Sequence, residues 1–168
     1  MNFLADSDTL IIDLRDNHGG APSMAALISS YLFDERTHLD DIYDHTQNSI
    51  EQSWTVPYLP GKKLTGKPVY VLTSHQTFST GEEFSFDLKN LRRATLVGEA
   101  TGGGAHPVAP HRIDAHFFIR VPFGRFTNPV TKADWEGTGV RPDIEVPAAD
   151  ALDEALKEAR KGLSTEHP

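Results

Sequence analysis

The stretch Leu10-Ile11-Ile12-Asp13-Leu14, followed at once by residues 15–20 and ending in Gly19-Gly20, places a polar turn directly after an apolar run. A short β-branched run of this kind predicts a buried strand, and residues 17–20 tolerate positive φ. Residues 23–33 then read as a helix. Two adjacent glycines let backbone N–H groups point outward together, which suits a developing oxyanion. A plain glycine turn between strand and helix is the alternative.

A second strand, loop and helix carry a serine. Residues 67–73 predict a strand, residues 74–78 a polar loop, and the spacing of Phe84, Leu88 and Leu91 predicts a helix over 79–91. Ser79 therefore lies at a helix N-terminus. With Glu82 three residues later it fits a capping box, which needs no function. The same position also suits a nucleophile, because free N–H groups and a positive dipole end would face the anion formed when Ser79 attacks a carbonyl.

Four motifs in order, residues 13–20, 79–82, 94–103 and 139–146, resemble the C-terminal-processing (tail-specific) serine proteases. Within this family, the sequence resembles more closely the branch with interphotoreceptor retinoid-binding protein modules and the tricorn protease core. The resemblance implies a crotonase-like α/β spiral of strands with flanking helices, a peptide or protein substrate, and no metal or organic cofactor. It implies Ser79 as nucleophile and the amides of Gly19, Gly20 and Thr80 as oxyanion donors. The alternative is a non-catalytic module that binds apolar ligands, as the retinoid-binding relatives do.

The general base departs from the pattern of the resembled family. Gly104 stands where members with a serine–lysine dyad carry their lysine, and the loop 101–105 contains none. Tricorn-like members use a histidine from upstream sequence, with a carboxylate that corresponds by spacing to Glu136. We therefore expect Glu136 to orient a base upstream of residue 1, with His106 and then His18 as candidates inside the chain. Each of these three also reads as an ordinary loop residue.

Composition narrows the class of protein further. The chain has 168 residues, a formal charge of −8, 38% hydrophobic residues and no cysteine, which fits one α/β domain. The negative charge argues against nucleic acid as a partner, and no apolar run predicts membrane insertion. The absence of cysteine leaves the compartment open, with the bacterial periplasm or secretion as the expectation for a longer form. A homo-oligomer is also left open.

The remaining segments predict the organisation around these motifs. Residues 40–56 suggest a projecting hairpin, residues 57–66 a linker, and residues 115–121, 124–127 and 144–146 short strands. Residues 148–161 predict a helix that closes the domain, with its apolar residues on one face. Residues 1–8 read as the end of an amphipathic helix. We expect residues 1–168 to be the catalytic core of a longer peptidase whose N-terminal helical region lies outside this sequence.

Overall fold

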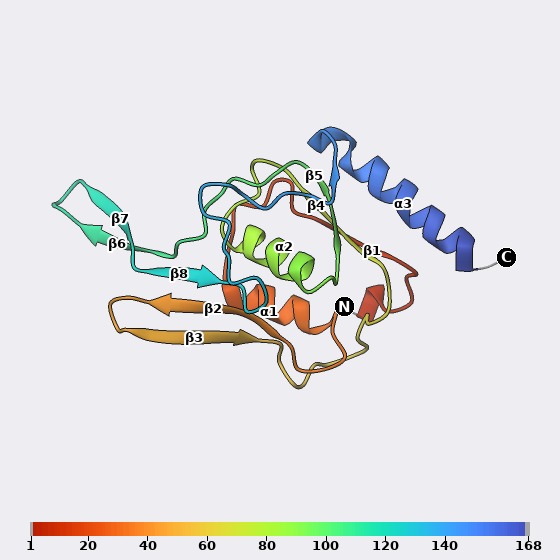
Figure 1. The fold of residues 1–168 in the computed structure, drawn as a ribbon, viewed down its shortest axis with the longest axis horizontal. Helices are drawn as coiled ribbons and strands as arrows, with labels where there is room; N and C mark the ends of the chain where they lie inside the picture. Colours follow the sequence, from red (N-terminus) through yellow and green to blue (C-terminus); the bar gives the residue numbers. More distant parts are fainter. Residues whose placement is uncertain (1, 167–168) are drawn as a thin grey trace.

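The computed structural model describes residues 2–166 and consists of a parallel sheet between two helical layers. The sheet has the order β1 (Leu10–Asp13), β4 (Val69–Thr73), β5 (Thr95–Gly98) and β9 (Ile144–Glu145). The helices α1 (Pro22–Ser30) and α2 (Thr80–Asn90) pack against each other on one face. Figure 1 shows α3 (Ala151–Glu166) away from them, and it contacts β4 and β5 on the other face. The mixed α/β architecture with a parallel sheet is thus confirmed.

Each face of the sheet has its own core. Towards α1 and α2 the buried side chains include Leu10, Val71, Phe84 and Leu88, all 7% exposed or less. Towards α3 a smaller cluster contains Leu72, Val97, Ala151 and Ala155. Because all four strands are parallel, the carboxyl ends of β1 and β4 lie at the same edge. This edge holds the two loops that the sequence singles out, residues 14–20 and 74–79.

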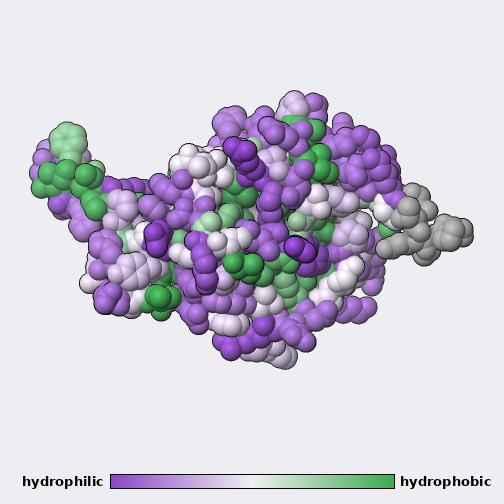
Figure 2. Space-filling view, in the orientation of Figure 1, coloured by the Kyte–Doolittle hydropathy of each residue, from purple (hydrophilic) through white to green (hydrophobic). Residues whose placement is uncertain are grey.

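Two antiparallel units extend from this body. The strands β2 (His38–Asp44), β3 (Ser49–Trp54) and β8 (Gly124–Thr127) form a sheet in the order β3-β2-β8. The strands β6 (Val108–Arg112) and β7 (Phe118–Pro122) form a separate hairpin that projects furthest from the body (Figure 1). Figure 2 shows apolar side chains gathered on this hairpin, and Phe117 and Phe118 are each 65% exposed.

Several expected elements need correction. The hairpin at 40–56 exists, but β8 pairs with β2 along its edge, so it belongs to a three-stranded sheet. The strand expected over 115–121 begins only at Phe118, and its partner β6 was missed because Pro110 interrupts the strand pattern. A short 3-10 turn, Asn2–Leu4, stands in place of the expected N-terminal α-helix end. Within the described residues, no helix combines the length and apolarity needed to cross a membrane.

Candidate active site

Ser79 has an unusual backbone conformation. It precedes α2 with φ 53° and ψ −125°, and its carbonyl accepts hydrogen bonds from the N–H groups of Glu82 (2.8 Å) and Glu83 (3.0 Å). An ordinary N-cap residue lies in the β region of φ/ψ space. A positive φ in a residue other than glycine costs roughly 1–3 kcal/mol. A capping role alone therefore does not explain why serine occupies this position.

Gly19 lies directly against Ser79. A Cβ atom built on Gly19 would stand 2.8 Å from the Ser79 Cβ, 3.2 Å from its Oγ and 3.3 Å from the Phe78 carbonyl oxygen. Gly19 also has φ 108°, which disfavours any other residue. The two segments singled out by the sequence thus meet at the serine, and the contact requires glycine at position 19.

The expected oxyanion donors differ in availability. The Gly19 N–H donates to Asn17 Oδ1 (2.9 Å) and is therefore occupied. The N–H groups of Gly20 and Thr80 donate to no acceptor within residues 2–166. The Thr80 hydroxyl donates to the Gly20 carbonyl (3.0 Å), which joins the two segments that carry these amides. Gly20 and Thr80 are thus the expected donors whose N–H groups are left for a developing negative charge.

Glu82 holds the backbone around Ser79 together, a role that the sequence suggested only as part of a cap. Its side chain is fully buried, and Oε2 accepts from Ser79 N (2.8 Å) and Gly104 N (2.9 Å). Oε1 accepts from the Thr101 hydroxyl and Gly103 N, both at 2.6 Å. One carboxyl group therefore fixes the glycine loop 101–104 onto the start of α2. The capping-box spacing was the only sequence signal for it.

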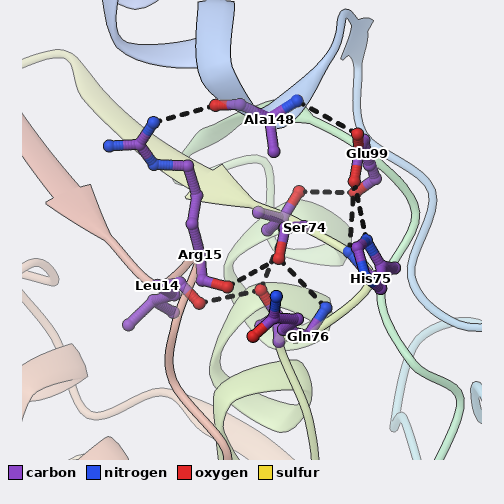
Figure 3. Close-up of polar contacts among 9 residues, drawn as sticks. Leu14, Arg15, Ser74, His75, Gln76, Glu99 and Ala148 are labelled. Atoms are coloured by element: carbon purple, nitrogen blue, oxygen red, sulfur yellow. Dashed lines mark hydrogen bonds and ion pairs between the residues drawn. The ribbon is translucent and has the colours of Figure 1, made fainter.

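Buried hydroxyls connect the loops after β1 and β4. The Thr77 hydroxyl donates to the Leu14 carbonyl (2.8 Å), and the Ser74 hydroxyl donates to the Arg15 carbonyl (2.6 Å). The Ser74 oxygen also accepts from Gln76 N (3.0 Å). Figure 3 shows the contacts of Ser74 with Arg15 and Gln76. They hold the loop that leads to Ser79 against the loop that ends in Gly19.

Two charged groups extend this network to the start of the C-terminal helical segment. Glu99 faces His75 Nδ1 (3.1 Å) and accepts from Ala148 N (3.1 Å), and these two contacts lower the pKa of the Glu99 carboxyl (Figure 3). The Arg15 guanidinium donates to the Ala148 carbonyl (2.8 Å). Its side-chain hydrogen bonds to Asp13 lower the pKa of that carboxyl. His75 is thereby paired outside the immediate surroundings of Ser79.

Phe78 occupies the space at the position where a dyad lysine would stand. A Cβ atom built on Gly104 would lie 2.2 Å from the Cζ atom of the Phe78 ring. Phe78 is 44% exposed, so its ring covers the loop from the solvent side. A lysine at position 104 would require this ring to move. The sequence has no lysine at position 104, and in the structure the Phe78 ring occupies the space that its side chain would need.

Glu136 and His106 lie beside each other. Glu136 Oε2 accepts from Ala105 N (2.7 Å) and His106 N (3.0 Å), and it lies 3.9 Å from His106 Nδ1. The other imidazole nitrogen is 4.0 Å from Asp134 Oδ2. Within the described residues, neither side chain forms a hydrogen bond with the Ser79 hydroxyl. Glu136 here anchors the backbone of the loop that contains His106.

His18 has a different environment. Its Nδ1 atom lies 3.2 Å from the Gln76 carbonyl oxygen, and the side chain is exposed. Across residues 2–166, no histidine, lysine or carboxylate is hydrogen-bonded to the Ser79 hydroxyl. The described residues therefore bring together the serine and two free amides without a base in contact.

An apolar pocket adjoins these groups. It has a volume of about 130 Å³ and is lined by residues of the glycine turn, α1 and the start of α2. Its walls include Leu14, Gly20, Met24, Ile28, Thr80 and Phe84. Since Gly20 and Thr80 also carry the free amides, a substrate carbonyl held by them would place an adjacent side chain at this pocket.

Known proteins are similar to this chain in sequence and in fold. Residues 2–146 match peptidase family S41. A carboxyl-terminal-processing protease of Picosynechococcus is 28% identical over 84% of this chain and 32% of its own length. The tricorn protease of Thermoplasma volcanium is 32% identical over 64% of this chain and 9% of its own length.

Solved structures share the fold. A putative S41 protease from Bacteroides fragilis has a TM-score of 0.77 at 22% identity, covering 93% of this chain and 45% of that one. The photosystem II D1 C-terminal processing protease has a TM-score of 0.69 at 24% identity, covering 84% and 35%. The chain spans about a third of the length of the processing proteases that it matches. With the family match over most of its residues, the chain belongs to peptidase family S41.

Proposed function

We propose that this domain hydrolyses peptide bonds with Ser79 as nucleophile and the amides of Gly20 and Thr80 as the oxyanion hole. The observation that carries the proposal is the position of Ser79, held at positive φ against Gly19 at the N-terminus of α2. The proposal includes the crotonase-like spiral as the fold of the complete protein. Family membership favours this function over a non-catalytic module for apolar ligands.

The chemistry follows from the geometry of these groups. Ser79 Oγ attacks the substrate carbonyl carbon while the general base takes the hydroxyl proton, and the carbonyl oxygen becomes an oxyanion that accepts from Gly20 N and Thr80 N. Removing one such preorganised donor costs about 2.7–4 kcal/mol in a serine protease. The N-terminal dipole of α2 stabilises the same charge. The apolar pocket beside these amides takes an apolar side chain next to the scissile bond.

In this proposal the general base comes from sequence outside residues 1–168, and this chain is the catalytic core of a longer peptidase. Glu136 orients that base, since its Oε1 atom accepts no hydrogen bond within the described residues and its side chain is 42% exposed. His106 is the rival base inside the chain. Its imidazole lies beside Glu136 and, within the described residues, forms no hydrogen bond with the Ser79 hydroxyl.

Active-site labelling tests the proposal. A fluorophosphonate probe should label a longer form at Ser79, and Ser79→Ala should abolish both labelling and peptide cleavage, whereas the exposed Ser49→Ala control should keep both. The 168-residue chain should fold but cleave slowly, because a serine without a base is a weak nucleophile. Strong hydrolysis by this chain that disappears with His106→Ala would place the base at His106 instead. Unchanged hydrolysis by Ser79→Ala would refute the assignment.

A further inference from the structure

A second cavity lies between α1 and the strands β2 and β3. It has a volume of about 220 Å³, far above the roughly 15 Å³ that one water molecule requires. Ser23 and Ala26 of α1 form one side and Trp54 of β3 part of the other. Three of the residues that line it carry carboxyl groups: Asp40, Glu51 and Glu83. It shares no lining residue with the apolar pocket beside Ser79.

The inner carboxyl groups of this cavity have no cationic partner. Asp40 and Glu83 are each 2% exposed, and Asp87 behind them is 3% exposed. Oxygen atoms of the three side chains lie within 4.8 Å of one another. Glu83 Oε2 accepts no hydrogen bond, and the polar partners of the Asp40 carboxyl are the neighbouring Asp87 carboxyl and the Ser53 hydroxyl. No lysine or arginine among the described residues forms an ion pair with the three groups. Buried carboxyls without a cationic partner are costly, so the cluster beside the cavity has acceptor capacity left for a cation.

Burial has a clear effect on these acids. It raises the pKa of Asp40 to about 6 and that of Glu83 to about 8, and it raises the pKa of Asp87 well above its usual range. The carboxyls also repel one another, which adds to the rise for Glu83 and Asp87. A bound cation with N–H donors would reverse both effects and allow the acids to ionise.

The groups that face the cluster from other elements leave this argument intact. A hydrogen bond with Asp87 favours the charged form of Asp40 most, and on β2 the His38 imidazole also favours it while Asp41 opposes it. From β3 the Ser53 hydroxyl also favours it, and at the start of α2 the Thr80 hydroxyl favours the charged form of Glu83. After β8, Asn128 favours the charged form of Asp87. The lining residues of α1 contribute no titratable side chain.

Asn128 presents a donor to this cluster and adds no metal ligand to it. Its Oδ1 atom accepts from Val130 N and Thr131 N, both at 3.0 Å, so its NH₂ group is the part turned towards Asp87. An NH₂ group is a donor and cannot bind a metal ion. A divalent ion commonly completes its coordination with water, so Ca²⁺ is the competing occupant that the experiment below tests. An ammonium or guanidinium group fits both the acceptors and the space.

The cavity is close enough to Ser79 to bind a side chain of the substrate residue near the one whose carbonyl Ser79 attacks. Glu83 lies one helical turn after Ser79 on α2, about 6 Å along the axis. On the other side, Ser23 is near the start of α1, shortly after the free amide of Gly20. One residue of extended peptide spans about 3.5 Å, so a substrate at the oxyanion hole comes within a few residues of the cavity.

We propose that this cavity is a specificity subsite for a lysine or arginine side chain of the peptide substrate, with Asp40 and Glu83 as its acceptors and Glu51 at its rim. That the cationic group belongs to a substrate rests on the proposed peptidase function. Binding of the cationic group itself requires neither the hydroxyl of Ser79 nor a base.

A binding experiment on the Ser79→Ala chain tests the subsite without turnover. The probes are acetyl-Ala-Arg-Ala-amide and its citrulline analogue, which has nearly the same shape but no charge. The arginine peptide should bind at least about tenfold more tightly, since it alone neutralises the buried acids. It should shift the backbone NMR signals of Gln52, Ser53 and Trp54. Calorimetry at pH 7 in buffers of different ionisation enthalpy should show proton release.

Isosteric neutral variants locate the acceptors. Asp40→Asn and Glu83→Gln should each weaken binding of the arginine peptide by about tenfold, while Glu145→Gln, an exposed acid on β9, should not. A folded Glu83→Gln chain that binds like the parent would overturn the proposal. Equal binding of the citrulline peptide, or shifts of the same signals by millimolar CaCl₂ that the arginine peptide does not cause, would overturn it as well.

Hydrolysis assays separate this subsite from the proposed function. Binding of the arginine peptide without any Ser79-dependent cleavage keeps the cationic site and refutes the peptidase step. Cleavage that depends on Ser79 but shows no preference between arginine and citrulline peptides refutes the subsite alone.

Discussion

Replacing Glu82 with glutamine keeps the shape of a buried side chain and turns one of its two acceptor oxygens into a donor. Whichever way the amide turns, two protein donors then face an NH₂ group: Thr101 Oγ1 with Gly103 N, or Ser79 N with Gly104 N. Each lost hydrogen bond to a charged acceptor is worth about 1.5–3 kcal/mol. Glu82→Gln should therefore lower the free energy of unfolding by about 3–6 kcal/mol, a large part of the roughly 5–15 kcal/mol of a typical domain.

Glu83→Gln is the matched control, because the same change is made one residue away at the same depth. The pKa of Glu83 is raised to about 8 by burial, so at pH 7 this side chain is mostly protonated and glutamine mimics it closely. We expect a change within about 1 kcal/mol, towards higher stability. Urea unfolding at pH 7, followed by tryptophan fluorescence, measures both variants under the same conditions.

Two results would refute this reasoning. A loss below about 1 kcal/mol in Glu82→Gln would mean that the four donors find other partners without cost. An equal loss in both variants would mean that any change at this depth of α2 is damaging, regardless of charge and hydrogen bonding.

Three further predictions follow from single positions. Gly19→Ala should reduce activity strongly and lower the free energy of unfolding by about 1–3 kcal/mol, because the φ of Gly19 is 108° and the new Cβ would meet Ser79. Gly20→Ala should leave stability nearly unchanged, because the space around Gly20 is open, and equal thermal shifts of the two variants would contradict this. Gly104→Ala should cost about 1 kcal/mol, and this cost should vanish in a Phe78→Ala background, as a double-mutant cycle in urea would reveal; additive losses would show that the ring is not the obstacle. The free energy of unfolding of the parent should fall as pH rises from about 4.5 to about 8 and level off above pH 8, because Glu83 binds its proton more tightly in the folded than in the unfolded chain. Glu83→Gln should flatten this fall, and parallel pH curves of the two proteins would show that Glu83 is not its cause.

The sequence predicted the parts of this fold that depend on local pattern. The β-branched runs at residues 10–13 and 69–73, and the helical spacing of Phe84 and Leu88, correctly indicated the strands and the helix that present Ser79. The strand β6 escaped prediction because Val108–Arg112 contains Pro110 and no apolar alternation. Its partner pairing, and not its own sequence, makes it a strand.

Features of the site that depend on segments distant in sequence could not be predicted. Gly19 and Gly20 look equivalent in sequence, and only the approach of Ser79 makes the first indispensable. The ring of Phe78 over Gly104 and the meeting of Asp40 with Glu83 arise from tertiary packing between elements far apart in the chain. The assignments of His106 and Glu136 stay predictions, since the two side chains lie together without reaching the Ser79 hydroxyl.

The backbone conformation of Ser79 lowers the stability of the folded chain, although the proposed catalysis requires a serine at this position. Glycine adopts a φ of 53° without the steric penalty that a Cβ atom brings, so Ser79→Gly should make the inactive protein more stable than the active one, by about 1 kcal/mol. Ser79→Ala removes the same hydroxyl but keeps the Cβ atom, so it should gain none of this stability. In a population of variants selected only for resistance to heat, glycine would therefore be expected to accumulate at position 79 and catalysis to disappear.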